Sequence, residues 1–254
     1  MKIFILCGGF GTRLDHQGKL MAKTMIKIGN EPVLIHIIKN FSKQGFNEFV
    51  LCAGHKIETI KKFFNKKNSN IIKNEKKHLS INTFIDKKKI LIDIIDTGKN
   101  TGTGGRIKKA FNKLSLKEDF LATYGDGLGN VPIKKLIKYH YDNKAMLTLT
   151  AVRPKQRYGV LKILRGKVSY FDNSKKKSDV YINGGFFVIS KTLIRLIKNP
   201  DTYIENEPFK KMIKNGKLYS YKHHGFWASI DTLKDKNDLD IIAKRNKILP
   251  WRVN

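Results

Sequence analysis

Cysteines and long apolar segments are scarce in this sequence, and their scarcity excludes several classes of protein. Only two cysteines occur, Cys7 and Cys52, each inside an apolar run typical of a strand. A disulfide-stapled secreted scaffold is therefore excluded, and we expect buried free thiols in a reducing, cytoplasmic compartment. No run of about 18 apolar residues is present, so we expect no membrane span. The N-terminal apolar run lacks a small-residue cleavage site and predicts a first strand rather than a signal peptide.

Acidic residues are also scarce, because 21 Asp and Glu stand against 51 Lys and Arg and give a formal net charge of +30. Such a charge attracts nucleic acids, anionic membranes or phosphorylated small molecules. The lysines are nevertheless scattered in short groups, such as those at 87–89 and 175–177, which is typical of a solvated surface. No nucleic-acid-binding motif accompanies them, so we expect no specific nucleic-acid partner.

The first 152 residues alternate between apolar runs and segments with helical periodicity. The apolar runs that predict strands lie at 3–6, 49–53, 90–95, 120–123 and 147–152. The segments with helical spacing of apolar residues lie at 33–41, 57–64, 107–114 and 133–141. This alternation predicts an α/β fold with a Rossmann-like, doubly wound, mostly parallel sheet.

The second part of the chain is less regular. Two strand-like runs flank Arg165 and Gly166, which predict a hairpin turn and a small β-rich insertion. A further strand, at 181–190, is interrupted by Gly184 and Gly185. Helices are expected at 193–198, 208–215 and 233–246. Neither an internal repeat nor a linker rich in Pro, Gly and Ser is present, so we expect one domain over residues 1–254.

A glycine-rich turn, Gly8–Leu14, follows the first predicted strand directly. Glycines let backbone N–H groups approach a phosphate chain closely, and Arg13 adds a fixed positive charge. The turn is not a P-loop, because it lacks the Gly-Lys-Ser/Thr ending, and its spacing does not match GxGxxG. Ligands bind at the carboxyl ends of strands in open α/β sheets. The turn therefore predicts a phosphate-binding site.

This GGFGTRL turn resembles the signature of the sugar-phosphate nucleotidyltransferases. Four later stretches resemble one branch of that family, the glucose-1-phosphate cytidylyltransferases. They are TGGR at 103–106, TYGDG at 123–127, INGGFF at 182–187 and the long segment at 225–236. Glu207-Pro208 also matches, and the resemblance runs in order from Met1 to about Trp251.

The resemblance implies a reaction between a nucleoside triphosphate, CTP, and a sugar 1-phosphate, glucose 1-phosphate. The products would be an NDP-sugar and pyrophosphate, formed by in-line displacement assisted by magnesium (Mg²⁺). Residues 1–152 would form the nucleotide-binding half, and residues 153–254 the sugar-binding and C-terminal half. The resemblance also implies a homo-oligomer.

The resemblance also implies roles for particular residues. Arg13 and Lys23 would be catalytic, because their positive charges offset the negative charge that grows on the leaving pyrophosphate. The implied nucleotide-binding residues are Leu6, Gly8, Gly9, Gly11, Thr12, Arg13, Lys23, Thr103, Gly104, Gly105, Arg106 and Asp126. The implied sugar-binding residues are Tyr124, Gly125, Arg157, Tyr158, Gly159, Lys175, Asn183, Gly184 and Glu207. Asp126 and Asp231 would bind the metal, since Mg²⁺ prefers a few carboxylates together with substrate phosphate oxygens.

Two departures from the family pattern bear on the substrate. Ser174 stands where the family has a lysine that meets the sugar phosphate, and Lys175 would replace that lysine after a shift of one residue. The family's Lys-Pro-Lys-Pro is replaced by residues 20–24, which keep Lys23. A second hypothesis is therefore the same chemistry on a heptose or modified hexose 1-phosphate. A third is a basic nucleic-acid-binding or regulatory protein without catalysis, which would bind any nucleic acid with a steep salt dependence.

Several of these residues also have a purely structural interpretation. Asp126 lies in Gly-Asp-Gly, a common turn composition, and Asp231 precedes the last helix and would suit an N-cap. Glu205 and Glu207 would suit a solvated surface pair, and Trp227 would suit core packing. The structure has to decide between these interpretations.

Overall fold

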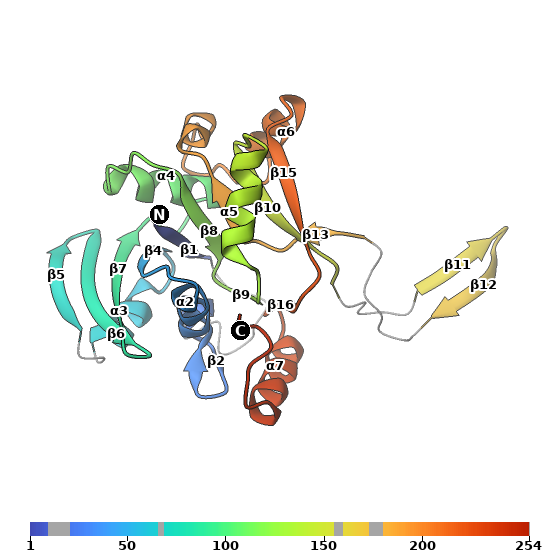
Figure 1. Ribbon diagram of the computed structural model, residues 1–254, viewed down its shortest axis with the longest axis horizontal. Helices are drawn as coiled ribbons and strands as arrows, with labels where there is room; N and C mark the ends of the chain where they lie inside the picture. The colour runs from blue at the N-terminus through green and yellow to red at the C-terminus, as the bar shows by residue number, and fades with distance from the viewer. Residues whose placement is uncertain (10–20, 66–68, 155–159, 173–179, 254) are drawn as a thin grey trace.

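A mixed sheet of ten strands forms the centre of the computed structural model, which describes residues 1–9, 21–65, 69–154, 160–172 and 180–253. Four neighbouring strands in the middle of the sheet run parallel (Figure 1). In spatial order they are β8 (Phe120–Tyr124), β1 (Ile3–Cys7), β4 (Glu48–Ala53) and β7 (Lys88–Asp96). The predicted α/β fold with a mostly parallel central sheet is therefore confirmed.

The strands that extend the sheet on its two sides are mostly antiparallel to their neighbours. Beyond β8 lie β14 (Phe187–Ile189), β10 (Leu147–Val152) and β13 (Ile182–Asn183), while β15 (Leu218–His223) pairs with β10 in parallel. Beyond β7 lie β6 (His78–Ile85) and β5 (Asn70–Glu75). The interruption predicted at Gly184 and Gly185 is the gap between β13 and β14.

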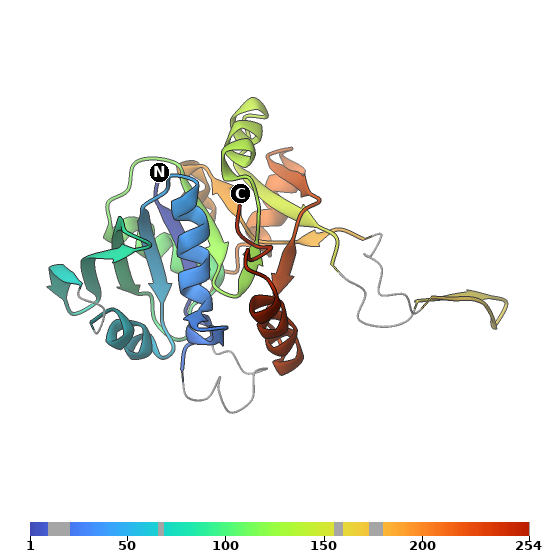
Figure 2. The same ribbon diagram turned by 60° about the horizontal axis from the view of Figure 1, so that its bottom comes forward.

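Helices cover both faces of the sheet, which is why β1 is apolar throughout rather than alternating. Ile3 and Ile5 belong to one buried cluster and Phe4 to the other. The helices that contribute to the first cluster are α2 (Val33–Lys43), α3 (Ile57–Asn65), α5 (Ile133–Asp142) and α7 (Leu233–Arg245). Those that contribute to the second are α4 (Thr103–Lys113) and α6 (Glu207–Lys214). Figure 2 shows α2 lying along the strands of the central sheet.

Short elements complete the fold. They are the 3₁₀ helices η2 (Lys23–Met25) and η3 (Lys191–Leu196), the hairpin of β2 (Lys27–Ile28) and β3 (Glu31–Pro32), and the antiparallel pair of β9 (Gly127–Gly129) and β16 (Trp227–Ser229). The helix expected at 193–198 is thus a 3₁₀ helix that begins two residues earlier. Among the helices of the described residues, none is long and apolar enough to cross a membrane.

The predicted hairpin is present and projects from the body of the molecule (Figures 1 and 2). It consists of β11 (Val160–Leu164) and β12 (Lys167–Asp172). Arg165 and Gly166 form its turn with φ angles of 49° and 81°, which is the pair of positive values that a type I′ turn requires. Cys7 and Cys52 are free and buried, as expected.

Candidate active site

A cleft of about 750 Å³ opens at the carboxyl ends of β1 and β8, the edge at which open α/β sheets bind ligands. Several residues predicted from the sequence lie along it. They are Leu6, Gly8, Gly9, Thr103, Arg106, Tyr124, Asp126, Asn183, Gly184 and Asp231. The site is thus assembled from the first strand, the start of α4, the end of β8, β13 and the segment before α7.

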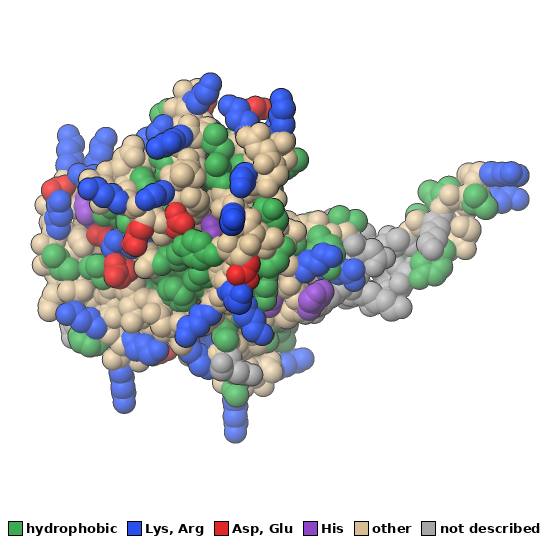
Figure 3. All heavy atoms as spheres, turned by 45° about the horizontal axis from the view of Figure 1, so that its top comes forward, with side chains coloured by type: hydrophobic (Ala, Val, Ile, Leu, Met, Phe, Trp, Pro, Cys, Tyr) green, Lys and Arg blue, Asp and Glu red, His purple; other side chains and the backbone are tan. Residues whose placement is uncertain are grey.

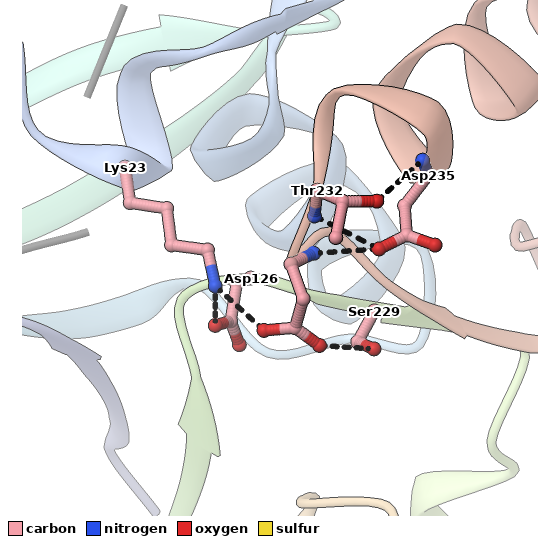
Figure 4. A network of polar contacts seen from close by, with 6 residues as sticks. Lys23, Asp126, Ser229, Thr232 and Asp235 are labelled. Atoms are coloured by element: carbon pink, nitrogen blue, oxygen red, sulfur yellow. Dashed lines mark hydrogen bonds and ion pairs between the residues drawn. The ribbon is translucent and has the colours of Figure 1, made fainter. Parts of the chain in front are cut away.

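At one side of this cleft, Lys23 brings the two predicted metal-binding aspartates together. Its Nζ lies 2.6 Å from Oδ2 of Asp126 and 3.0 Å from Oδ1 of Asp231. Figure 4 shows the Lys23 side chain reaching down to Asp126 from the segment that contains η2. Because both carboxylates contact one nitrogen atom, their oxygens are no farther apart than these two distances added together. The three side chains form a single charged cluster.

The charge balance of this cluster is suited to a cation. Two carboxylates share one ammonium group, so the cluster keeps a net negative charge. Burial alone would lower the pKa of Lys23, but the charge of Asp126, the hydrogen bond to it and the same two interactions with Asp231 outweigh that effect and raise the pKa. Lys23 is therefore a stable cation here. A divalent ion with oxygen ligands fits the donor set of Asp126 and Asp231.

Neighbouring polar groups hold Asp231 in position. Ser229 Oγ donates a hydrogen bond of 2.9 Å to Asp231 Oδ2, while Oδ1 faces Lys23. The backbone N–H of Asp231 donates to Asp235 Oδ2 at 3.1 Å. The N-cap of α7 is Thr232, which forms a capping box with Asp235 (Figure 4). Asp231 is therefore not the cap residue, and its carboxylate remains directed at the cleft.

The Arg106 guanidinium is held by the backbone around it. Its Nη1 donates to Thr97 Oγ1 and to the carbonyl of Gly98, both at 2.7 Å. Its Nη2 donates to the carbonyls of Gly8 at 2.8 Å and Lys99 at 3.0 Å. Arg106, only 4% exposed, thus fastens the end of β1 to the loop after β7 and to α4. The implied role of Arg106 in binding the nucleotide stays a prediction.

Gly104 and Gly105, which were predicted to bind the nucleotide, lie inside the protein behind the cleft wall. A Cβ atom on Gly105 would collide with the backbone of Pro200, and one on Gly104 would crowd the carbonyl of Thr202. The N–H of Gly105 donates to the Thr202 carbonyl at 3.1 Å. These glycines therefore allow the segment before α6 to pack on the first turn of α4.

Glu205 is a site residue that the sequence analysis missed. Its carboxylate accepts hydrogen bonds of 2.6 Å from both Thr103 Oγ1 and Tyr124 Oη, two groups on the cleft wall. Glu207, predicted instead, is exposed on α6 and pairs with Lys210 at 3.1 Å. Among the described residues, Glu207 is not part of the cleft lining. Both glutamates carry the same local sequence signal, because Glu205 lies two residues before α6 and Glu207 is the first residue of that helix.

Trp227 also has a role beyond packing. It lines the cleft, and its Nε1 donates to the carbonyl of Gly184 at 2.8 Å. Trp227 lies on β16, a strand of three residues. A strand this short shows no alternation of apolar and polar residues in the sequence, so the position of Trp227 at the cleft could not be predicted. The other lining residues, to which the sequence analysis gave no role, are Lys99, Asn100, Thr101, Gly102, Gly127, Ile182, Asp201, Tyr203 and Ser229.

Seven predicted residues lie outside the part of the chain that the structure describes. They are Gly11, Thr12 and Arg13 of the glycine-rich turn, Arg157, Tyr158 and Gly159 before the hairpin, and Lys175 after it. Their roles stay predictions. Gly125 lies directly behind the cleft, where a Cβ atom would meet Thr24 and the carbonyl of Leu6.

The family model described as "Nucleotidyl transferase" matches residues 2–237. A glucose-1-phosphate cytidylyltransferase from Salmonella typhimurium is 37% identical, and the match covers 99% of each chain. A Bacillus subtilis protein named a probable glucose-1-phosphate cytidylyltransferase is 39% identical over the full length of both chains.

Solved structures show the same fold. HddC from Yersinia pseudotuberculosis superposes with a TM-score of 0.71 at 22% identity, over 96% of this chain and 99% of HddC. The resemblance drawn from the five sequence stretches is confirmed by these matches, which extend over nearly the whole chain rather than over the glycine-rich turn alone. The chain belongs to the nucleotidyl transferase family.

Proposed function

We propose that the protein transfers a cytidylyl group from CTP to glucose 1-phosphate. A phosphate oxygen of the sugar forms a bond to the α-phosphorus of CTP. The bond from that phosphorus to the oxygen bridging to the β-phosphate breaks, so that CDP-glucose and pyrophosphate are the products. Two relatives with 37–39% identity over at least 99% of this chain carry glucose-1-phosphate cytidylyltransferase in their names, which supports this choice of substrates.

The observation that carries the proposal is the cluster of Lys23, Asp126 and Asp231 at the cleft. The two reactants are both anions, so their mutual repulsion has to be screened before they can approach each other. Asp126 and Asp231 would hold Mg²⁺, which when bound neutralises phosphate charge and polarises the phosphate being attacked. Lys23 would add a second cation beside the same phosphates, where it offsets charge that grows on the pyrophosphate.

The remaining contribution of the protein is positioning. The sugar phosphate is already ionised near neutral pH, so no side chain has to act as a covalent nucleophile. Gly8 and Gly9 place backbone groups at the end of β1 on one side of the cleft, and Asn183 and Gly184 lie along it from β13. Holding both reactants in line between these groups is itself a large share of such catalysis.

A grid of substrates tests the proposal. We would measure pyrophosphate release with CTP, UTP, GTP and dTTP, each combined with glucose, mannose and heptose 1-phosphates, and identify products by mass spectrometry. The pair of CTP and glucose 1-phosphate should give the highest kcat/KM, by roughly tenfold or more over UTP. Equal rates with all four triphosphates would contradict the choice of CTP, and a preference for another sugar would favour the second hypothesis on the sugar phosphate.

A further inference from the structure

A chain of hydrogen bonds runs along the cleft wall from Asn183 to Thr103 and passes through Glu205. Asn183 Nδ2 donates to Tyr124 Oη at 3.0 Å, and Tyr124 Oη donates to Glu205 at 2.6 Å. Thr103 Oγ1 donates to the other carboxylate oxygen at 2.6 Å. Asn183 and Tyr124 are on the side expected to hold the sugar, whereas Thr103 is on the nucleotide side. One half-buried carboxylate therefore joins the two sides.

The carboxylate fixes the direction of every bond in this chain. An ionised carboxylate can only accept, so both hydroxyl groups must donate to it. Tyr124 Oη then has its lone pairs left for the Asn183 amide N–H. The Asn183 Oδ1 atom in turn accepts from the N–H of Gly185 at 3.0 Å. The amide of Asn183 is thereby held in one of its two orientations.

Tyr124 and Thr103 each have a second hydrogen-bond partner besides Glu205, because Tyr124 Oη also accepts from Asn183 Nδ2. Thr103 has its own support, because its Oγ1 accepts from the N–H of Ile204 at 3.0 Å. Ile204 immediately precedes Glu205. The segment that contains Glu205 therefore binds Thr103, the first residue of α4, through both a side chain and a backbone N–H group.

We propose that Glu205 is a positioning residue that aligns both substrates, by orienting Thr103 toward the nucleotide and, through Tyr124, Asn183 toward the sugar 1-phosphate. Thr103, Tyr124 and Asn183 line the cleft, whereas Glu205 lies behind them. Its effect on the reaction therefore passes through these side chains. The assignment of the two sides to the two substrates rests on the proposed function.

The test is a set of KM values for CTP and glucose 1-phosphate. Tyr124→Phe should raise the KM for the sugar phosphate, and Thr103→Val the KM for CTP, each by roughly tenfold for a lost hydrogen bond to a charged group. Glu205→Ala should raise both. In the Glu205→Ala background, adding either of the other substitutions should change the KM values by less than about twofold, because the shared partner is already gone.

Glu205→Gln is an isosteric second variant that keeps the packing. Its amide oxygen can still accept from Tyr124, which cannot turn its proton toward the donating Asn183. The Gln amide N–H then faces Thr103 Oγ1, which has to accept from it and turn its own proton away. The Thr103 hydroxyl is thereby reoriented, so only the KM for CTP should rise. The matched control is Glu58→Gln on the surface of α3, an exposed glutamate that pairs with Lys61 at 3.0 Å and should leave both KM values unchanged.

Three results would overturn the inference: unchanged KM values in Glu205→Gln, effects that multiply in the double variants, or an equal effect of Glu58→Gln. Its failure is distinguishable from failure of the proposed function. If the wild-type protein prefers another pair of substrates, the proposed function is wrong, and the same variants measured on that pair still test Glu205.

Discussion

At the scale of single residues, the structure separates carboxylates that look alike in the sequence. Asp231 and Asp235 both lie near the start of α7, but Asp235 belongs to the capping box and Asp231 to the cluster with Lys23. The two carboxylate oxygens of Asp231 have different partners, because Ser229 donates a hydrogen bond to one and Lys23 to the other. The hydrogen bond from Ser229 therefore fixes the orientation of the Asp231 carboxylate.

Ser229→Ala tests this support. Without the hydroxyl group the Asp231 carboxylate can rotate, so we expect the Mg²⁺ concentration for half-maximal activity to rise roughly tenfold, as for other partners of metal ligands. The KM for CTP at saturating Mg²⁺ should change little. The matched control is Ser220→Ala on β15, whose side chain is exposed. An unchanged Mg²⁺ requirement in Ser229→Ala would show that Ser229 does not position a metal ligand.

At the scale of elements, two glycines of the predicted nucleotide site serve different purposes. Gly105 is buried in the first turn of α4, where a side chain would collide with the backbone of Pro200. Gly9 follows β1 and lines the cleft, and no residue that the structure describes lies within 4 Å of where its Cβ atom would be. The first glycine is required by packing between elements. The space beside the second is not filled by any of the described residues.

Alanine at these two positions should therefore have opposite effects. Gly105→Ala should lower the free energy of unfolding by about 1–3 kcal/mol through overpacking, although alanine normally stabilises a helix by about 1 kcal/mol relative to glycine. Gly9→Ala should change the free energy of unfolding by less than about 0.5 kcal/mol and raise the KM for CTP. Urea denaturation and steady-state kinetics measure both. A stabilised Gly105→Ala variant would contradict the packing argument.

Some elements could be predicted from the sequence and others could not, for physical reasons. The central strands are buried on both faces and therefore appear as apolar runs. Gly166 readily adopts the positive φ that the hairpin turn requires at its second position. β5 has only exposed side chains, so it carries no apolar pattern, and β15 is recognisable only by its pairing with β10. Glu205 and Glu207 differ only in what the fold places beside them. That difference depends on the contacts of Glu205 with Thr103 and Tyr124, which lie 102 and 81 positions away in the sequence.

At the scale of the whole molecule, the net charge and the site have opposite signs. Lys and Arg side chains are spread over the body and the tip of the projecting hairpin in Figure 3, in agreement with the scattered groups in the sequence. The cluster at the cleft instead has two carboxylates for one lysine. A positive surface attracts anionic substrates from solution, whereas the local excess of negative charge suits a divalent cation.

The fold brings this cluster together from three distant segments. Lys23 is separated from Asp126 by 103 positions and from Asp231 by 208. Two carboxylates repel each other at short range, so placing Asp126 and Asp231 together is unfavourable unless a cation lies between them. The central claim is that these two aspartates act together, with a metal ion, on the reacting phosphates.

The most direct measurement is Mg²⁺-dependent pyrophosphate release by Asp126→Ala and Asp231→Ala, with circular dichroism to confirm that each variant is folded. The control is Asp238→Ala, an exposed aspartate on α7. We predict a loss of roughly 100-fold or more in kcat for each of the first two variants, and wild-type activity for the third. Retained Mg²⁺-dependent release in both folded Asp126→Ala and Asp231→Ala would contradict the account.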